Sequence, residues 1–157
     1  MILFFLFYIC KMKKISFTNH QAPAFTFKNR TIVKQWLEKI MRQYGYTSFE
    51  IAYIFSNDEY VLQINQQFLQ HDFYTDIITF DYSTKQKIES EIYISIDRVK
   101  ENAVQLSTTF NEELHRVMAH GVLHLCGLKD KTKTQQTDMR NAENNALLLL
   151  RKMLLKK

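Results

Sequence analysis

The sequence predicts a single-domain α+β fold, in which a four-stranded sheet is packed against about five helices. Segments rich in β-branched and aromatic residues occur between segments with helical spacing of apolar residues. Only 3 glycines and 1 proline are present, which favours long regular elements and argues against a flexible linker. A chain of 157 residues with 46% hydrophobic content can fill one substantial core.

Four segments are expected to be strands, because they are short, apolar and rich in Ile, Thr, Tyr and Phe. They are residues 14–18, 49–56, 75–83 and 91–97. The last two, TDIITFDYS and EIYISID, carry the strongest strand signal. We expect these two segments to pair with each other as a hairpin.

Apolar residues at helical spacing predict the helices. They are expected in residues 31–45, in a segment opened by Ser56, and in residues 97–106, 109–127 and 134–155. Two starts carry a capping-box pattern, in which Ser56 is followed by Glu59 and Thr109 by Glu112. The helix after Ser56 is expected to bury one face: Val61, Ile64 and Phe68. The last helix is expected to bury an apolar stripe: Met139, Ala142, Ala146, Leu147, Leu150 and Leu154.

The first ten residues, MILFFLFYIC, have the composition of a membrane segment but not its length. A spanning helix needs about 20 apolar residues. A secretory signal has a basic start and a small-residue cleavage site, and neither is found here. Because MKKISF at Met12 is a credible start, we expect residues 1–11 to be a non-native or disordered extension and residues 12–157 to form the domain. A membrane anchor is the alternative for this segment.

The charge and the cysteine content narrow the class of protein. A formal net charge of +5 suits a polyanionic partner, although many basic enzymes bind no nucleic acid. The 2 cysteines, Cys10 and Cys126, are too few for a disulfide framework. A reducing, cytoplasmic location is therefore expected, without stable membrane association.

The stretch HGVLHLCGLKDK, residues 120–131, has the spacing of a metal site. Positions i and i+4 of a helix share one face, so His120 and His124 can direct their imidazoles at one ion. Gly127 can end the helix and turn the chain back, which brings Asp130 to a third corner. Two imidazoles, one carboxylate and an open position are typical of a catalytic site with one Zn²⁺ per chain. The alternative is a chance pair of histidines at helical spacing.

The neighbouring residues are interpreted as supporting rather than ligating. Cys126 is expected to be a small buried packing residue, and His115, which falls off the ligand face, is expected on the surface. Zincin-like protease helices with the pattern HExxHxxGxxH use the glutamate after the first histidine as general base. Gly121 stands at that position, so peptide hydrolysis by that route is disfavoured.

These residues give the chain its resemblance to the YbeY family of bacterial endoribonucleases, whose signature is HGxLHLxGYDH. The signature is matched at His120, Gly121, Leu123, His124, Leu125 and Gly127. Residues 65–68 and 75–80 resemble the family's asparagine-aromatic and TDVLSF segments, and residues 91–95 resemble its GDIxIS strand. The resemblance covers essentially the whole chain from Met12 onward.

The resemblance implies a cytoplasmic, zinc-dependent ribonuclease that acts on single-stranded RNA. It implies a role in ribosomal RNA maturation, notably at the small-subunit 3′ end, and in ribosome quality control. Ribosomal RNA and the ribosome or small-subunit proteins are the implied partners. The family's third metal histidine corresponds here to Asp130. An aspartate can ligate zinc, but its negative charge is expected to make a bound water less acidic and to favour harder ions.

The residues that contact RNA are marked less clearly. Many members of the family have an arginine suited to RNA phosphate where this chain has Leu69. His71, Lys129 and Lys131 are the residues that could compensate as substrate-binding groups. Asp76 is a candidate for proton transfer, with a capping or turn carboxylate as the alternative. Beyond these residues, catalysis is expected to rest on a metal-bound water.

Two other classes of function also fit the sequence. The first is a metal-dependent hydrolase of another substrate such as peptides, against which Gly121 argues. The second is a non-catalytic, ribosome-associated module that binds a metal for structure, which Leu69 favours.

Overall fold

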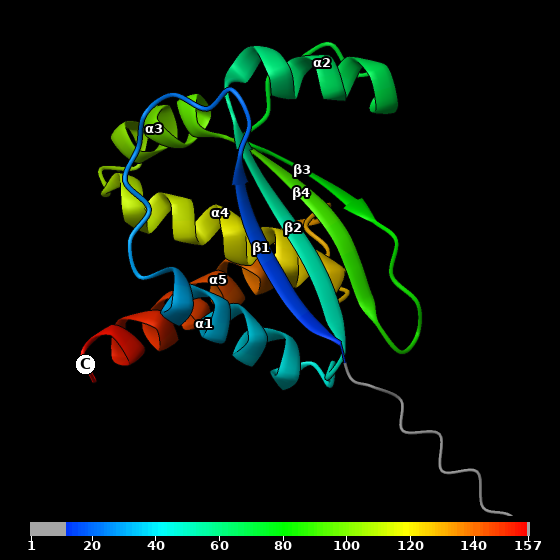
Figure 1. The fold of residues 1–157 in the computed structure, drawn as a ribbon, viewed down its shortest axis with the longest axis vertical. Coiled ribbons are helices and arrows are strands. Elements are labelled where there is room, and N and C mark those ends of the chain that lie inside the picture. The colour runs from blue at the N-terminus through cyan, green and yellow to red at the C-terminus, as the bar shows by residue number, and fades with distance from the viewer. Residues whose placement is uncertain (1–11, 157) are drawn as a thin grey trace, which may run out of the picture.

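The computed structural model describes residues 12–156 of the chain (Figure 1). The expected N-terminal extension, residues 1–11, lies outside the described residues, as does residue 157. The strands are β1 (Lys13–Asn19), β2 (Phe49–Ser56), β3 (Ile77–Asp81) and β4 (Ile88–Ser95). The helices are α1 (Arg30–Gln43), α2 (Asp58–Leu69), α3 (Ile96–Gln105), α4 (Phe110–Leu125) and α5 (Lys133–Leu154). Within residues 12–156 the predicted α+β domain, with its four strands and five helices, is confirmed.

The sheet has the order β1-β2-β4-β3. β2 runs parallel to both β1 and β4, and β3 pairs antiparallel with β4. The predicted hairpin is therefore confirmed, with Thr79 opposite Ile92 in its register. β3 lies at the edge of the sheet and is the strand with most contacts to α4. This edge is where the candidate site forms.

One face of the sheet is covered by α1, α4 and α5 (Figure 1). Alternate residues of β2 point into this core, because successive side chains of a strand point to opposite faces. Two large polar-tipped residues of the core have hydrogen-bond partners. The Trp36 indole N–H donates to the Ala146 carbonyl at 2.7 Å, and the Tyr53 hydroxyl donates to the Met118 carbonyl at 3.0 Å. The core therefore holds α4 firmly between the sheet and two other helices.

The second face of the sheet is partly covered by α2. Val61 and Ile64 pack against Ile78 of β3 in a small separate cluster. Phe68, expected to complete this apolar face, is instead 57% exposed. It lies near the end of α2, at the outer strand of the sheet, where an edge-on contact with Phe80 covers only part of its ring.

The expected helix starts are confirmed at one position and wrong at another. Thr109 caps α4, because its hydroxyl accepts a hydrogen bond from the Glu112 N–H at 3.2 Å. Ser56 does not cap α2. It pairs with β4 as the last residue of β2, and the next residue, Asn57, accepts the capping hydrogen bond from the Tyr60 N–H. In the part of the chain from residue 12 to residue 156, no helix combines the length and the hydropathy that a membrane crossing requires.

Candidate metal centre

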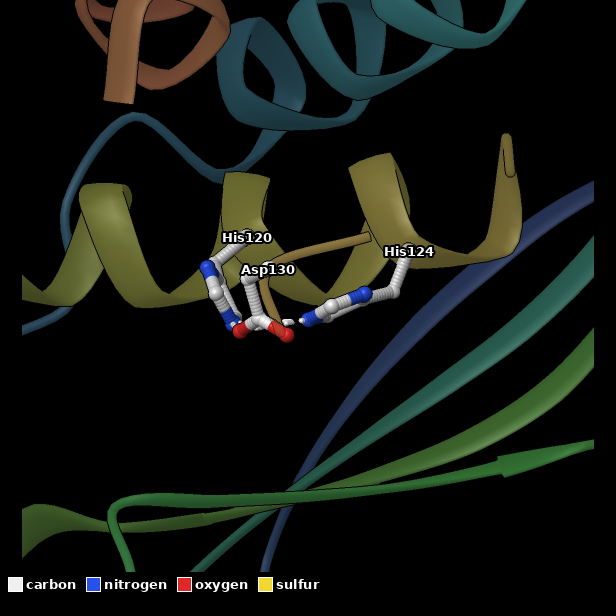
Figure 2. A group of neighbouring side chains, drawn as sticks. All are labelled: His120, His124 and Asp130. Carbon is white, nitrogen blue, oxygen red and sulfur yellow. Dashed lines mark hydrogen bonds and ion pairs between the residues drawn. The ribbon is translucent and has the colours of Figure 1, made fainter. Parts of the chain in front are cut away.

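His120 and His124 lie one turn apart on α4, and Figure 2 shows their rings on the same side of the helix, above β3 and β4. Their Nε2 atoms are 3.0 Å apart. Both rings are partly buried, with side-chain exposures of 20% and 32%. The predicted pairing of the two imidazoles is thus present in the structure.

The third side chain arrives from the loop after α4. Gly127 has φ +99, a conformation that favours glycine, and its N–H donates to the His124 carbonyl at 2.9 Å. The chain then turns back, and Asp130 Oδ2 lies 3.4 Å from His124 Nε2 and 3.7 Å from His120 Nε2 (Figure 2). Ligand atoms of a tetrahedral zinc site are about 3.3 to 3.5 Å apart. The three atoms therefore fit around one small cation.

The hydrogen bond made by the Nδ1 atom of each ring determines whether its Nε2 atom carries a proton or a lone pair. His120 Nδ1–H donates to Glu143 Oε1 at 2.7 Å, and His124 Nδ1–H donates to the Leu128 carbonyl at 2.9 Å. In a neutral imidazole with a protonated Nδ1, the Nε2 atom carries a lone pair. Two such lone pairs and the Asp130 carboxylate converge on one point, which is an arrangement that a cation stabilises.

A buried ionic network fixes the position of the His120 ring. Arg116 makes two hydrogen bonds to Glu113, at 2.6 and 2.8 Å, and lies 3.4 Å from Glu143. Burial raises the pKa of Glu143, but the hydrogen bond from His120 and the charge of Arg116 outweigh it, so this pKa is lowered from its ordinary value. The neighbouring acids raise the pKa of Arg116, chiefly through the hydrogen bonds to Glu113. Glu143 therefore stays ionised and orients His120.

The sequence analysis missed Glu143 and Arg116. Glu143 lies within the stripe of apolar positions on α5 and is 2% exposed. An acidic residue at a core-facing position of the predicted helix could have indicated its role. Arg116 follows Glu113 at the spacing of an ion pair on one helix face. Their ion pair, between residues 27 positions apart in the sequence, joins α4 to α5.

Gly121 allows α4 to lie close to the sheet at the centre. A Cβ atom at this position would be 2.9 Å from Ile77 Cδ1 and 3.3 Å from Ile92 Cδ1. A glutamate, as in zinc-protease helices, would meet these side chains rather than a substrate. Glycine has no side chain that could act as a protease-type base, and the packing of α4 on the sheet also disfavours a glutamate at position 121.

A cleft opens between the histidines and the edge strand β3. It is lined by Thr75, Asp76, Ile77, Thr79, Asp81, His120, His124 and Leu125. Asp76 accepts a hydrogen bond from the Asn102 side chain at 3.0 Å and lies 3.9 Å from Arg116. Burial raises the pKa of Asp76, and the positive charge of Arg116 opposes that shift only in part. Asp76 is therefore a partly shielded carboxyl group in the wall of the cleft.

The predicted substrate-binding residues lie around the centre rather than in it. Lys129 and Lys131 flank Asp130 and are exposed. His71 and Leu69 belong to the end of α2 and the connection that follows, and the exposed His71 ring stacks on Phe73. None of these four residues lines the cleft.

The expectation for Cys126 holds, whereas that for His115 is wrong. Cys126 packs partly buried against the core, and burial raises the pKa of its thiol to about 12. His115 is not a surface residue, because it packs against Trp36 and Phe27. Burial lowers the pKa of His115 to about 4. The contacts that cover it come from α1 and the segment before it, which lie far away in sequence.

Comparison with known proteins identifies the family. The model of the family Endoribonuclease YbeY matches residues 14–151. The chain belongs to this family. Among its relatives, Endoribonuclease YbeY of Cytophaga hutchinsonii is 52% identical over 129 residues, which cover 82% of this chain and 90% of the relative. Endoribonuclease YbeY of Porphyromonas gingivalis strain W83 is 49% identical over 122 residues, covering 78% of this chain and 81% of the relative.

A solved structure shares this fold. The solution structure of TM1509 from Thermotoga maritima, a NESGC target protein, matches with a TM-score of 0.59 and 24% identity. The match covers 87% of this chain and 88% of that protein. The arrangement of sheet and helices is therefore shared along most of both chains.

Proposed function

We propose that this chain is a metal-dependent endoribonuclease that acts in ribosomal RNA processing and holds one Zn²⁺ ion with His120, His124 and Asp130. The observation that carries the proposal is the convergence of two Nε2 lone pairs and one carboxylate at the wall of an open cleft. Membership of the YbeY family and the relatives named Endoribonuclease YbeY support RNA as the substrate. Asp130 takes the place of the third histidine of the family signature.

The chemistry fits a phosphodiester substrate. When bound, a metal ion at this centre supplies Lewis-acid stabilisation of phosphate charge and activates the nucleophile. His120 and His124 bind as neutral ligands, whereas Asp130 brings a negative charge that lowers the net charge of the site. Harder ions such as Mn²⁺ therefore compete with Zn²⁺ better here than at a site with three histidines.

The residues around the centre have separate roles in this proposal. Lys129 and Lys131, exposed on either side of Asp130, contact substrate phosphates. Asp76 moves a proton at the wall of the cleft, because its raised pKa brings its protonated form closer to working pH. The substrates are single-stranded segments of ribosomal RNA, notably near the small-subunit 3′ end, with the ribosome or small-subunit proteins as cytoplasmic partners.

The proposal is tested by cleavage of a single-stranded RNA with purified protein, with and without a chelator, followed by re-addition of Zn²⁺ or Mn²⁺. Cleavage is expected to stop with the chelator, to return with metal and to be lost in His124→Ala. His20→Ala is the matched control, because His20 is an exposed histidine packed on Tyr60 of α2, outside the residues that line the cleft.

A casein digestion measured in parallel separates the nuclease from a peptide hydrolase. The nuclease predicts no casein cleavage under any of these metal conditions. RNA cleavage that persists in His124→Ala, or that is insensitive to the chelator, would contradict the proposal. Absence of RNA cleavage together with ribosome co-sedimentation that survives His124→Ala would point to a non-catalytic module.

A further inference from the structure

Exposed aromatic side chains lie directly before the cleft in the connection from α2 to β3. This connection runs back along α2 (Figure 1) and reaches the cleft at Thr75 and Asp76. The two residues before them, Phe73 and Tyr74, are 58% and 45% exposed. Together with the exposed His71, they form what we call the aromatic patch. The chain thus carries three solvent-exposed rings just before it reaches the wall of the cleft.

The backbone of the aromatic patch is held in place although its rings are largely exposed to solvent. Asn65 of α2 is 2% exposed, and its side-chain N–H₂ donates to the Phe73 carbonyl at 2.8 Å. The Gln66 side chain donates to Asp72 at 2.6 Å. A buried amide is costly unless it is hydrogen-bonded, so Asn65 fixes the segment strongly. The hydrophobic effect favours burial of such rings, so a group of them fixed in solvent offers apolar surface that a ligand can cover.

The geometry of the rings suits flat ligands. His71 stacks on Phe73 with ring centroids 5.1 Å apart and an interplanar angle of 23°. The Arg98 guanidinium lies 4.8 Å from the centroid of the Tyr74 ring. Ion pairs at 2.8 Å with Asp58 and 2.7 Å with Glu101 hold Arg98 there. The aromatic patch therefore combines solvent-exposed rings with a positive group held over one of them.

We propose that the aromatic patch is a stacking platform for unpaired bases of the RNA strand that enters the cleft. The inference rests on the proposed nuclease function. Unstacked bases of single-stranded RNA stack on aromatic side chains, and this contact tolerates many sequences because every base has a π face. Bases of a duplex are already stacked and paired, so they cannot use such a platform. The patch also provides an RNA contact near the end of α2, where the uncharged Leu69 cannot bind a phosphate.

The test measures binding separately from cleavage. Chelator-treated full-length protein is titrated against a labelled single-stranded RNA of about ten nucleotides, by fluorescence anisotropy. A duplex of the same sequence and a strand with abasic positions serve as the other two ligands. The variants are Phe73→Ala, Tyr74→Ala and the conservative Phe73→Tyr. Tyr82→Ala is the matched control, because Tyr82 is a 55% exposed aromatic residue in a surface pocket that it shares with Glu50, Glu89 and Glu91.

Phe73→Ala and Tyr74→Ala are each expected to weaken single-strand binding about fivefold to tenfold, and to leave duplex binding unchanged. Phe73→Tyr and Tyr82→Ala are expected to bind like wild type. Abasic RNA is expected to bind wild type weakly and to lose nothing further in Phe73→Ala. The wild-type arm, abasic against intact RNA, does not depend on the folding of any variant.

Single-strand binding equal to wild type in both alanine variants would overturn the stacking platform. An equal loss for duplex and single strand would overturn it as well, since that result indicates a general phosphate contact. The nuclease proposal fails on a different observation, the absence of metal-dependent RNA cleavage by wild-type protein. Normal cleavage with unaffected binding in Phe73→Ala and Tyr74→Ala would remove the platform alone.

Discussion

The two sides of the metal centre are held in place by different kinds of interaction. On the inner side, His120 is positioned by Glu143, which is paired with Arg116 and is 2% exposed. On the outer side, Asp130 comes from the short loop between α4 and α5, and 41% of its side chain is exposed. The inner side is therefore part of the folded core, whereas the outer side can vary without disturbing it.

This difference teaches which ligand the chain can change. A substitution on the inner side leaves a buried charge without its partner, and the whole domain bears the cost. A substitution at Asp130 changes one half-exposed group in a loop, where most replacements cost little stability. A change of residue type at position 130 is thus compatible with an unchanged fold.

The largest expected effect comes from breaking the inner side. Arg116→Met leaves Glu113 and Glu143 buried without their shared cation and is expected to destabilise the fold by about 3–5 kcal/mol. The matched control is Arg42→Met on α1, whose ion pair with Glu38 is mostly exposed and is worth at most about 1 kcal/mol. Denaturant unfolding measures both changes. An equal decrease in the free energy of unfolding of the two variants would contradict the claim that burial makes the Arg116 ion pairs important.

The next effect concerns His115, the partly buried histidine of α4 that lies outside the candidate metal centre. The pKa of His115 is lowered from 6.5 to about 4, so between these values the unfolded chain binds a proton that the folded chain does not. Stability from this residue is complete above pH 6.5 and is lost as the pH falls toward 4, by up to about 3 kcal/mol. His115→Leu is expected to remove this part of the acid sensitivity. Parallel stability–pH curves for wild type and variant would contradict the assignment.

The outer side is expected to respond in metal affinity rather than in stability. Asp130→Ala is expected to weaken Zn²⁺ binding by about 10- to 100-fold or more, since even the outer partners of metal ligands are worth that much. Its unfolding free energy without metal is expected to stay within about 0.5 kcal/mol of wild type. Asp130→His, which replaces the carboxylate with an imidazole that also ligates Zn²⁺, is expected to keep tight binding. Undiminished affinity in Asp130→Ala would show that another group is the third ligand.

The smallest effect is expected where α4 meets the sheet. Gly121→Ala places a Cβ atom 2.9 Å from Ile77 Cδ1, the end of a flexible side chain that can shift. The overpacking is partly offset by the better helix propensity of alanine, which leaves a loss of about 1 kcal/mol. Thermal unfolding measures it. A gain in stability would show that this approach of α4 to β3 is looser than the structure indicates.

Local patterns were sufficient to predict the elements and the convergence of His120, His124 and Asp130. The hairpin of β3 and β4 follows from β-branched and aromatic residues. The cluster follows from helical spacing together with the turn at Gly127. Both depend on residues close in sequence, where the backbone geometry of a helix or a turn fixes the outcome.

What could not be predicted depends on contacts between distant segments. His115 was expected on the surface because it falls off the ligand face, and the rings that cover it, Trp36 and Phe27, lie far away along the chain. Ser56 was assigned to a helix cap from its spacing to Glu59, and its pairing with β4 is a contact between distant segments that this spacing does not reveal. Glu143 was missed because its partner Arg116 lies on another helix. A single sequence marks such residues only as polar groups at apolar positions.

The most direct test of the central claim is calorimetric titration of metal-free protein with Zn²⁺, for wild type and for the double variant His120→Ala/His124→Ala. The convergence of three ligand atoms within 4.8 Å of one another predicts about one Zn²⁺ per chain for wild type and no specific binding for the double variant. Equal binding by both proteins, or none by folded wild type, would contradict the metal centre.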